Sequence, residues 1–518
     1  MNIKTLAFYL PQFHSVPEND AWWGEGFTEW TAVRAAKPLF SGHMQPKEPL
    51  NDKYYDLLKK ETFKWQAQIA KQGGVSGFCF YHYWFRNGRK ILEKPAEKLL
   101  EWTDIDIPFC FCWANQTWAR TWSHLRNKNE WTRKYENNNN HNPGDSGILL
   151  EQKYGFEKDW IEHFEYLAPF FMDKRYIKID GKPLFIFTHP QDVAGLALRI
   201  IEWRDIARQN GFPDLYLIGR CNEVNMANDL KSLDAILILE PDASVHSHVK
   251  RELLENRFTT DFGIREYDYD CLWETNLARS FNSPPKTFLS GVVNYDNTPR
   301  MGETASIIRN GTPEKFKDYF RRLVERTIEK GNEYVFINAW NEWGEGMYLE
   351  PDKENGFSYL KAINDVMTEY SQMNCEKEII INENQITTAQ IVSDTDKYKT
   401  LAVILDKWLA LKEKGIKLEK CLADNNYFTI AIYGMGILGR HLVEELNDGL
   451  INVKYAIDKN NGNIKSLTPI YGIDDSWPKV DLIVITPLYE LFEIVSLIKT
   501  KVDFSILSIE ELIFENYH

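Results

Sequence analysis

The chain has 518 residues, a formal net charge of −14 and an aromatic content of 14%, including 17 Trp. It is too long for one ordinary hydrophobic core, so two or more domains are expected, and its acidity argues against a nucleic-acid binder. The Cys residues lack metal-ligand spacing, no secretion signal is visible, and no apolar stretch reaches the roughly 18 residues of a membrane helix. We therefore expect a cytoplasmic protein without a metal site or a transmembrane segment.

Short apolar runs alternate with amphipathic helical patterns along the first part of the chain. The runs are typical of strands buried in a parallel sheet: Thr5–Leu10, Val75–Tyr81, Pro108–Trp113, Pro183–Thr188, Leu215–Gly219, Ala235–Leu239, Thr287–Asn294 and Tyr334–Trp340. Helices are expected at Lys53–Gln72, Lys158–Met172, Ala197–Gln209 and Pro313–Lys330. The alternation predicts an α/β fold, a (β/α)8 TIM barrel over residues 1–365, with inserted loops at Asn137–Asn140, Pro143-Gly144 and 241–285.

The pattern changes over residues 366–424, which we interpret as a linker and a helix. Met373–Thr388 is polar and has no clear period, whereas Lys397–Leu411 has the pattern of an amphipathic packing helix.

Residues 425–518 predict a small Rossmann-like α/β domain. A strand, a Gly-x-Gly-x-x-Gly turn at Gly434, Gly436 and Gly439, and a helix follow one another, and a second strand then ends in Asp458. Such glycines let a diphosphate approach a helix N-terminus, and the acidic residue can accept a hydrogen bond from a ribose hydroxyl. These four residues are the predicted cofactor-binding set, for a nucleotide or a nucleotide sugar. A domain retained only for structure is the alternative.

Polar and aromatic residues follow most of the barrel strands. Because catalytic groups of TIM barrels lie at the carboxyl ends of the strands, one substrate pocket is expected to collect them. The predicted substrate-binding residues are Tyr9, Gln12, His14, Tyr81, His82, Trp84, Trp113, Asn115, Asn222, Glu223, Tyr295, Asp296, Arg300, Trp340, Asn341, Trp343 and Tyr348. The alternative for His82 is a hydrogen-bonded structural role, and for any single Trp it is a place in the core.

The segment after the last strand, Asn341–Pro351, contains two carboxylates three residues apart, Glu342 and Glu345. A carboxyl pair beside aromatic rings is typical of glycosidic-bond chemistry, in which one group moves a proton and the other supports the charge at the sugar. We predict that both are catalytic and that the barrel needs no cofactor. A solvated acidic loop is the alternative, and Glu350 fits a loop-stabilising role.

Three motifs resemble the WbsX-type proteins, described as glycosyltransferases of lipopolysaccharide O-antigen clusters with a barrel similar to glycoside hydrolase family 99. The motifs are Phe8–His14, Trp22–Trp30 and Asn341–Gly346. The resemblance implies that Glu342 is the base that deprotonates the sugar 2-hydroxyl and Glu345 the acid that protonates the leaving oxygen. Gly344 stands where the hydrolases are expected to have His. The second motif implies that another part of the cleft is built by Trp23, Glu25, Glu29 and Trp30.

The combined interpretation is an enzyme that makes or breaks a glycosidic bond during surface-polysaccharide assembly, with a retaining two-glutamate mechanism. Its partner would be an oligosaccharide or an activated sugar, and peripheral association with lipid-linked glycan machinery stays open. An intracellular glycoside hydrolase or transglycosidase, a non-catalytic carbohydrate-binding barrel and a nucleotide-dependent oxidoreductase are the alternatives.

Overall fold

Eight parallel strands close into a barrel in the computed structural model, which describes residues 3–119, 148–221, 232–245, 263–282, 286–376, 394–447, 449–459, 468–488 and 491–515. The barrel strands are β1 (Lys4–Tyr9), β2 (Val75–His82), β5 (Phe109–Trp113), β9 (Lys182–Phe187), β10 (Tyr216–Arg220), β11 (Ala235–Ile238), β13 (Thr287–Val292) and β15 (Tyr334–Asn338). β1 pairs with both β2 and β15, and β9 pairs with β10, so the sheet has no free edge. The predicted (β/α)8 barrel is confirmed.

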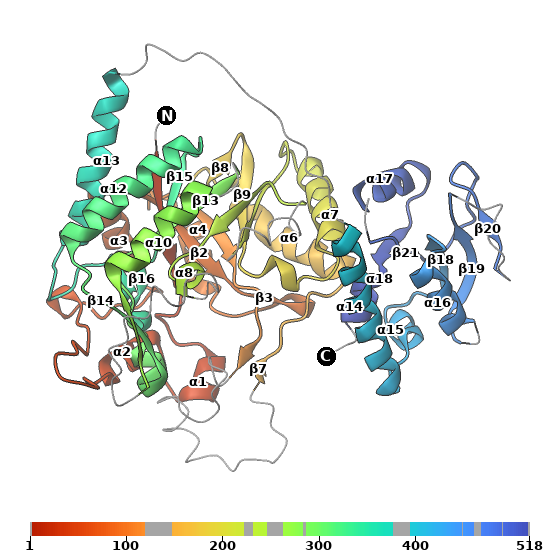
Figure 1. The fold of residues 1–518 in the computed structure, drawn as a ribbon, viewed down its shortest axis with the longest axis horizontal. Coiled ribbons are helices and arrows are strands. Elements are labelled where there is room, and N and C mark those ends of the chain that lie inside the picture. The colour runs from red at the N-terminus through yellow and green to blue at the C-terminus, as the bar shows by residue number, and fades with distance from the viewer. Residues whose placement is uncertain are drawn as a thin grey trace.

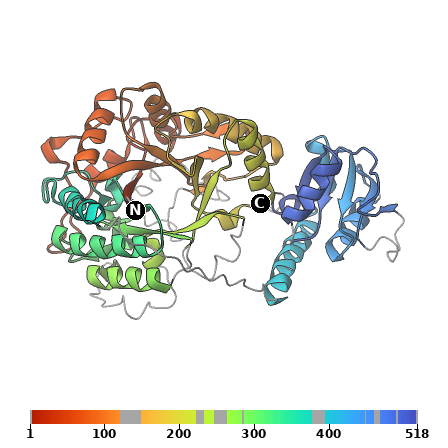
Figure 2. The same ribbon diagram turned by 90° about the horizontal axis from the view of Figure 1, so that it is seen from above.

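Helices cover the outside of this barrel (Figures 1 and 2). They are α3 (Lys60–Gln72), α4 (Lys94–Glu101), α6 (Glu157–Met172), α7 (Leu196–Gln209), α10 (Tyr269–Asn282), α12 (Pro313–Glu329) and α13 (Ser358–Glu376). The strands are buried almost throughout because their side chains pack inward on one another and outward on these helices.

Three sequence expectations need correction. The helix expected from Lys53 begins only at Lys60, because Leu57 is buried and its N–H donates to Phe13 as part of a packed loop. The region 241–285 is not simply a loop: it contains α8 (Asp242–Val245), β12 (Arg265–Asp268) and α10. Residues 373–376 continue helix α13 instead of starting a linker. The loop expected at Asn137–Gly144 lies outside the described residues.

The C-terminal part contains a second, five-stranded parallel sheet. Its strands, in spatial order, are β20 (Ile470–Tyr471), β19 (Asn452–Ile457), β18 (Thr429–Tyr433), β21 (Leu482–Ile485) and β22 (Ser505–Ser508). The accompanying helices are α14 (Asp394–Glu413), α15 (Leu418–Asp424), α16 (Ile437–Leu446), α17 (Leu491–Lys501) and α18 (Ile509–Phe514). Trp408 of α14 is buried in the core of this sheet, so α14 is a packing helix as the sequence predicts.

The C-terminal sheet and its helices pack against α7 of the barrel (Figure 1). Leu198 and Ile201 of α7 belong to the same apolar cluster as Val495 of α17. Beside them, the fully buried Arg199 donates to Glu511 of α18 and to Glu202, each at 2.6 Å. The two parts are therefore joined by an apolar contact and a buried ion pair. No helix within the described ranges is long and apolar enough to cross a membrane.

Candidate active site

The loop after β15 forms a tight hairpin at the mouth of the barrel. β16 (Asn341–Glu342) pairs antiparallel with β17 (Met347–Tyr348), and the 3-10 turn η6 (Trp343–Glu345) connects them through Gly346, which has a left-handed φ of 63°. The ring of Trp343 stacks on that of Tyr348 at 3.8 Å. The Asn341 side chain accepts from the N–H of Leu10 at 2.7 Å and donates to its carbonyl at 3.0 Å. These bonds tie the hairpin to the end of β1.

Glu342 and Glu345 meet at one guanidinium, that of Arg300 in the short helix α11 (Thr298–Met301). Arg300 Nη2 donates to Glu342 Oε2 at 2.7 Å, and Nη1 donates to Glu345. Arg300 Nε donates to a third carboxylate, Glu29, at 2.8 Å. One guanidinium therefore contacts both members of the predicted pair and brings them to the same site.

The two predicted catalytic carboxyls differ in exposure. Glu342 is buried, whereas a quarter (25%) of the Glu345 side chain is exposed. Burial raises the pKa of Glu342 to about 8, assisted by the charges of Glu345 and Glu29, although Arg300 acts in the opposite direction. Burial likewise raises the pKa of Glu345. Burial thus favours the protonated form of both carboxyls, and the base and acid roles that the family resemblance implies for them stay predictions.

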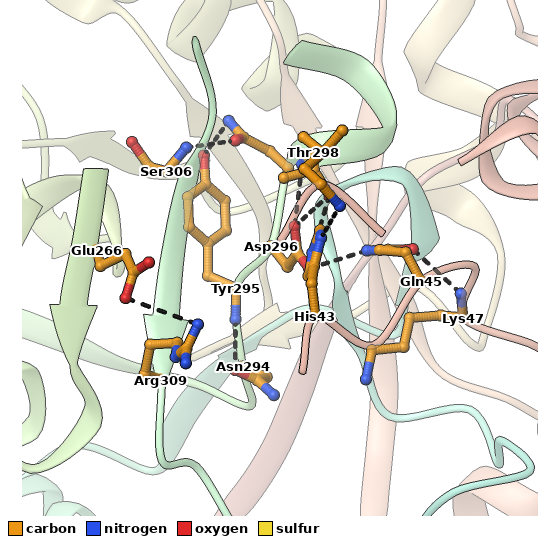
Figure 3. Close-up of polar contacts among 12 residues, drawn as sticks. His43, Gln45, Lys47, Glu266, Asn294, Tyr295, Asp296, Thr298, Ser306 and Arg309 are labelled. Carbon is orange, nitrogen blue, oxygen red and sulfur yellow. Dashed lines mark hydrogen bonds and ion pairs between the residues drawn. The ribbon is translucent and has the colours of Figure 1, made fainter. Parts of the chain in front are cut away.

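Asp296 fixes the segment that carries Arg300. Figure 3 shows His43, Gln45 and Thr298 gathered around its carboxylate. His43 Nε2 and Gln45 Nε2 each lie 2.9 Å from Asp296 Oδ2, and the Thr298 hydroxyl donates to Oδ1 at 2.6 Å. The Asp296 N–H donates to the Glu345 carbonyl at 2.7 Å, so the same residue also holds the catalytic hairpin.

Further predicted residues surround the three carboxylates. Gln12 donates to Glu29 at 3.3 Å, and the Trp30 ring lies 5.4 Å from that of Trp343. Tyr81 and Tyr295 are half-buried. Their hydroxyl pKa values are raised by burial and then by the charges of Glu342 and Glu345 respectively, which places them beside the pair.

Several other predicted substrate-binding residues lie in the protein interior. They make the following contacts: Tyr9 to Gln66, His14 Nδ1 to the Pro11 carbonyl, His82 to His163, Trp113 to the Trp84 carbonyl, and Asn115 to Thr188 and His189. Trp340 is fully buried, and Trp84 stacks on His163 at 4.6 Å. A structural role in the core therefore fits His82 and these Trp residues better than sugar binding does.

The remaining predicted residues lie elsewhere. Trp23 is buried against Phe27, and Glu25 is exposed. Asn222 and Glu223 lie outside the described residues. Among the residues that the structure describes, no group of three or more His, Cys, Asp or Glu side chains is arranged to hold a metal ion.

Sequence reasoning missed a buried layer behind the hairpin. Glu350, considered only as a loop residue, accepts from Tyr55 at 2.8 Å, from Gln66 at 2.7 Å and from the Trp343 indole at 2.7 Å. It therefore holds Trp343 in place. His43, Gln45, Tyr55 and Gln66 carry no local motif, so only the fold reveals their roles.

The predicted nucleotide loop connects β18 to α16. A β-carbon on Gly439 would lie 2.0 Å from the Gly434 carbonyl oxygen, whereas one on Gly436 would meet nothing within 4 Å. Asp458 Oδ2 accepts from the Met435 N–H at 2.7 Å. The loop thus combines close strand–helix packing with an open position at Gly436, and one Asp458 oxygen is bonded to the loop itself.

Comparisons with known proteins agree with the sequence resemblance. The family model described as "Glycosyltransferase WbsX" matches residues 5–363. An uncharacterized protein, WxcX, from Xanthomonas campestris pv. campestris is 33% identical over 372 residues, which are 70% of this chain and 49% of that protein. The chain therefore spans about half the length of this relative.

Among solved structures, the family 99 endo-α-mannosidase from Bacteroides thetaiotaomicron overlaps 72% of this chain and 98% of its own, with 15% identity and a TM-score of 0.42. A similarity at that level bears on neither substrate nor mechanism.

Proposed function

The chain belongs to the WbsX glycosyltransferase family, and on that premise we propose that it is a carbohydrate-active enzyme whose Glu342–Glu345 pair makes or breaks a glycosidic bond. The observation that carries the proposal is the contact of both carboxylates with the single guanidinium of Arg300. A structural acidic loop would not need two carboxyls with raised pKa values on one buried arginine.

The chemistry requires one proton donor and one carboxylate at the reacting sugar. The protonated member gives its proton to the leaving oxygen as the glycosidic bond breaks, and the ionised member either attacks the anomeric carbon or takes the proton of the sugar 2-hydroxyl. In the second case the 2-oxygen bonds to the anomeric carbon. The acceptor then attacks this carbon from the face that the leaving group has left and gives its proton to the carboxylate that protonated the leaving oxygen. The bond to the enzyme carboxylate or to the 2-oxygen breaks, and the 2-oxygen regains its proton. Carboxyls about 5 Å apart favour net retention, whereas inverting pairs are separated by roughly 6.5–9.5 Å. We propose the retaining form because the family resemblance implies it, and the anomeric configuration of the first product tests it.

The acceptor decides between two forms of this activity. A sugar hydroxyl gives transfer, in line with the family description, and water gives hydrolysis by an intracellular glycosidase or transglycosidase. The resemblance to O-antigen cluster proteins supports surface polysaccharide as the product. We propose transfer during lipopolysaccharide assembly as the leading form.

The C-terminal domain supports a second proposal, binding of a nucleotide or nucleotide sugar. The open position at Gly436 next to the N-terminus of α16 favours it. In calorimetry with the full chain, Gly436→Val should abolish the heat of binding of sugar nucleotides or nicotinamide dinucleotides, whereas Lys420→Ala, at an exposed position of α15, should not.

The barrel activity is tested with the full chain and three groups of probes: 4-nitrophenyl glycosides of the common hexoses, oligosaccharides, and sugar nucleotides with an oligosaccharide acceptor. Products are separated by chromatography, and the anomeric configuration of the first product is read by proton NMR. We expect a new or a cleaved glycosidic bond with retained configuration, and none with the Glu342→Gln/Glu345→Gln double variant. Product formation by that double variant at the wild-type rate would refute the proposal.

A further inference from the structure

Gly344, between the two predicted catalytic residues, has no room for a side chain. A β-carbon there would lie 1.8 Å from Glu29 Oε1 and 2.9 Å from Arg300 Nε. The φ angle of Gly344 does not lie in the left-handed region, so the need for glycine is spatial. The volume that residue 344 would fill is taken by the carboxylate of Glu29.

Glu29 reaches this position from a distant part of the chain. It is the first residue of α2 (Glu29–Ala35), and its N–H donates to the Gln12 carbonyl at 2.9 Å. One carboxylate oxygen accepts from Gln12 Nε2, and the other accepts from Arg300 Nε at 2.8 Å and lies 2.7 Å from Nη2. Glu29 has no exposed surface. It can therefore act on a substrate only through another residue.

The residue through which it acts is Arg300. A single guanidinium faces three carboxylates, so its positive charge is shared among Glu29, Glu342 and Glu345. In addition to burial, the charge of Asp242 raises the pKa of Glu345, and Glu345 in turn raises that of Tyr295. Burial and then Glu342 raise the pKa values of Tyr81 and Tyr83, and Arg220 lowers that of Tyr81. Glu29 both accepts from Arg300 Nε and fills the space over Gly344.

We propose that Glu29 is a positioning residue that fixes Arg300 against the Glu342–Glu345 pair and shares its positive charge, and that residue 344 is glycine because Glu29 fills its side-chain space. The inference deepens the proposed function, since it concerns the same site. In support, the charge of Glu29 contributes, after burial, to the raised pKa of both Glu342 and Glu345. Without that charge, Arg300 would stabilise the ionised pair more strongly.

The claim that Glu29 fills the side-chain space of residue 344 is tested by comparing the melting temperatures of single and double variants. Gly344→Ala should lower the Tm of the wild type and of Glu29→Gln by about 3 °C or more, because the Gln side chain has the same shape as Glu. In the Glu29→Ala background, Gly344→Ala should lower the Tm by less than a third of that amount, because the carboxylate no longer fills the space. An equal loss in all three backgrounds would overturn the spatial claim.

The claim that Glu29 shares the positive charge of Arg300 is tested with the single variant Glu29→Gln. We expect the pH range in which ionisation of Glu342 lowers the Tm to move down by about half a unit or more. Where turnover is measurable, both limbs of the pH profile of kcat/KM should also move to lower pH. Superimposable Tm–pH curves would overturn the charge claim. Because the Tm readouts need no substrate, failure of the proposed glycosidic activity would leave this test intact.

Discussion

At the scale of single residues, the site is organised by Arg300. The sequence predicts Glu342, Glu345 and Arg300 individually, because two of them form a local motif and the third follows a strand. It predicts one pocket for them but not the bonding of both carboxylates to Arg300, because these contacts join segments separated by 42 and 45 positions. The role of Glu29 is equally hidden, since only the fold brings α2 over Gly344.

Stability should depend on pH through Glu342. Its pKa is raised from 4.5 to about 8 in the folded state, so the folded protein binds a proton more tightly than the unfolded chain. Stability from this group is present below about pH 4.5 and is lost as pH rises towards 8. We expect the Tm of Glu342→Gln, relative to wild type, to increase between pH 5 and pH 8.5.

Differential scanning fluorimetry across this pH range measures the effect. Glu329→Gln is the matched control, because Glu329 is exposed at the C-terminal end of α12. A Tm difference for Glu342→Gln that stays constant or falls with pH would show that Glu342 ionises normally.

At the scale of elements, the eight barrel strands were predictable because each is a short apolar run buried on both faces. The strand β12 escaped prediction because Arg265–Asp268 is polar and pairs with β14 (Ser306–Arg309), outside the barrel. Trp113 and Trp340 are buried, although the sequence predicts them in a sugar pocket. An aromatic ring at a strand end looks the same in sequence whether it faces a pocket or the core.

The two glycines of the β18–α16 turn should differ sharply when substituted. Gly439→Ala places a β-carbon against the Gly434 carbonyl oxygen, so strand and helix must separate, and we expect a loss of about 2 kcal/mol in unfolding free energy. The β-carbon of Gly436→Ala meets open space, so this variant should change the unfolding free energy by less than about 0.5 kcal/mol. Urea unfolding followed by far-UV circular dichroism compares the two. Equal losses would mean that the turn is packed differently.

At the scale of the whole molecule, the barrel and the C-terminal domain share a buried interface. Arg199 of α7 is fully buried between Glu202 and Glu511, and its Nη2 also donates to the Ile506 carbonyl at 3.0 Å. Sequence patterns do not reveal this tie, because Arg199 lies within an ordinary amphipathic helix.

Removing the arginine should loosen the interface. Arg199→Met leaves two buried carboxyls without their cation, and we expect a loss of about 3 kcal/mol and separate unfolding of the two domains. Arg208→Met, at an exposed position of the same helix, is the control. Calorimetry that shows one unchanged transition for Arg199→Met would mean that the other contacts between the domains, such as the apolar cluster and the Lys499–Asp205 ion pair, hold them together without the arginine.

The most direct test of the account is the turnover of two single variants on whichever substrate the wild-type protein converts. We expect Glu342→Gln and Glu345→Gln each to lower kcat/KM by at least about 10³-fold, since each removes a proton-transfer or charge-stabilising group, while Glu329→Gln keeps the wild-type value. The group that protonates the leaving oxygen should be the one whose variant recovers on a 2,4-dinitrophenyl glycoside, which needs no proton. Turnover of either variant within tenfold of wild type, in a folded protein, would contradict the assignment of the pair.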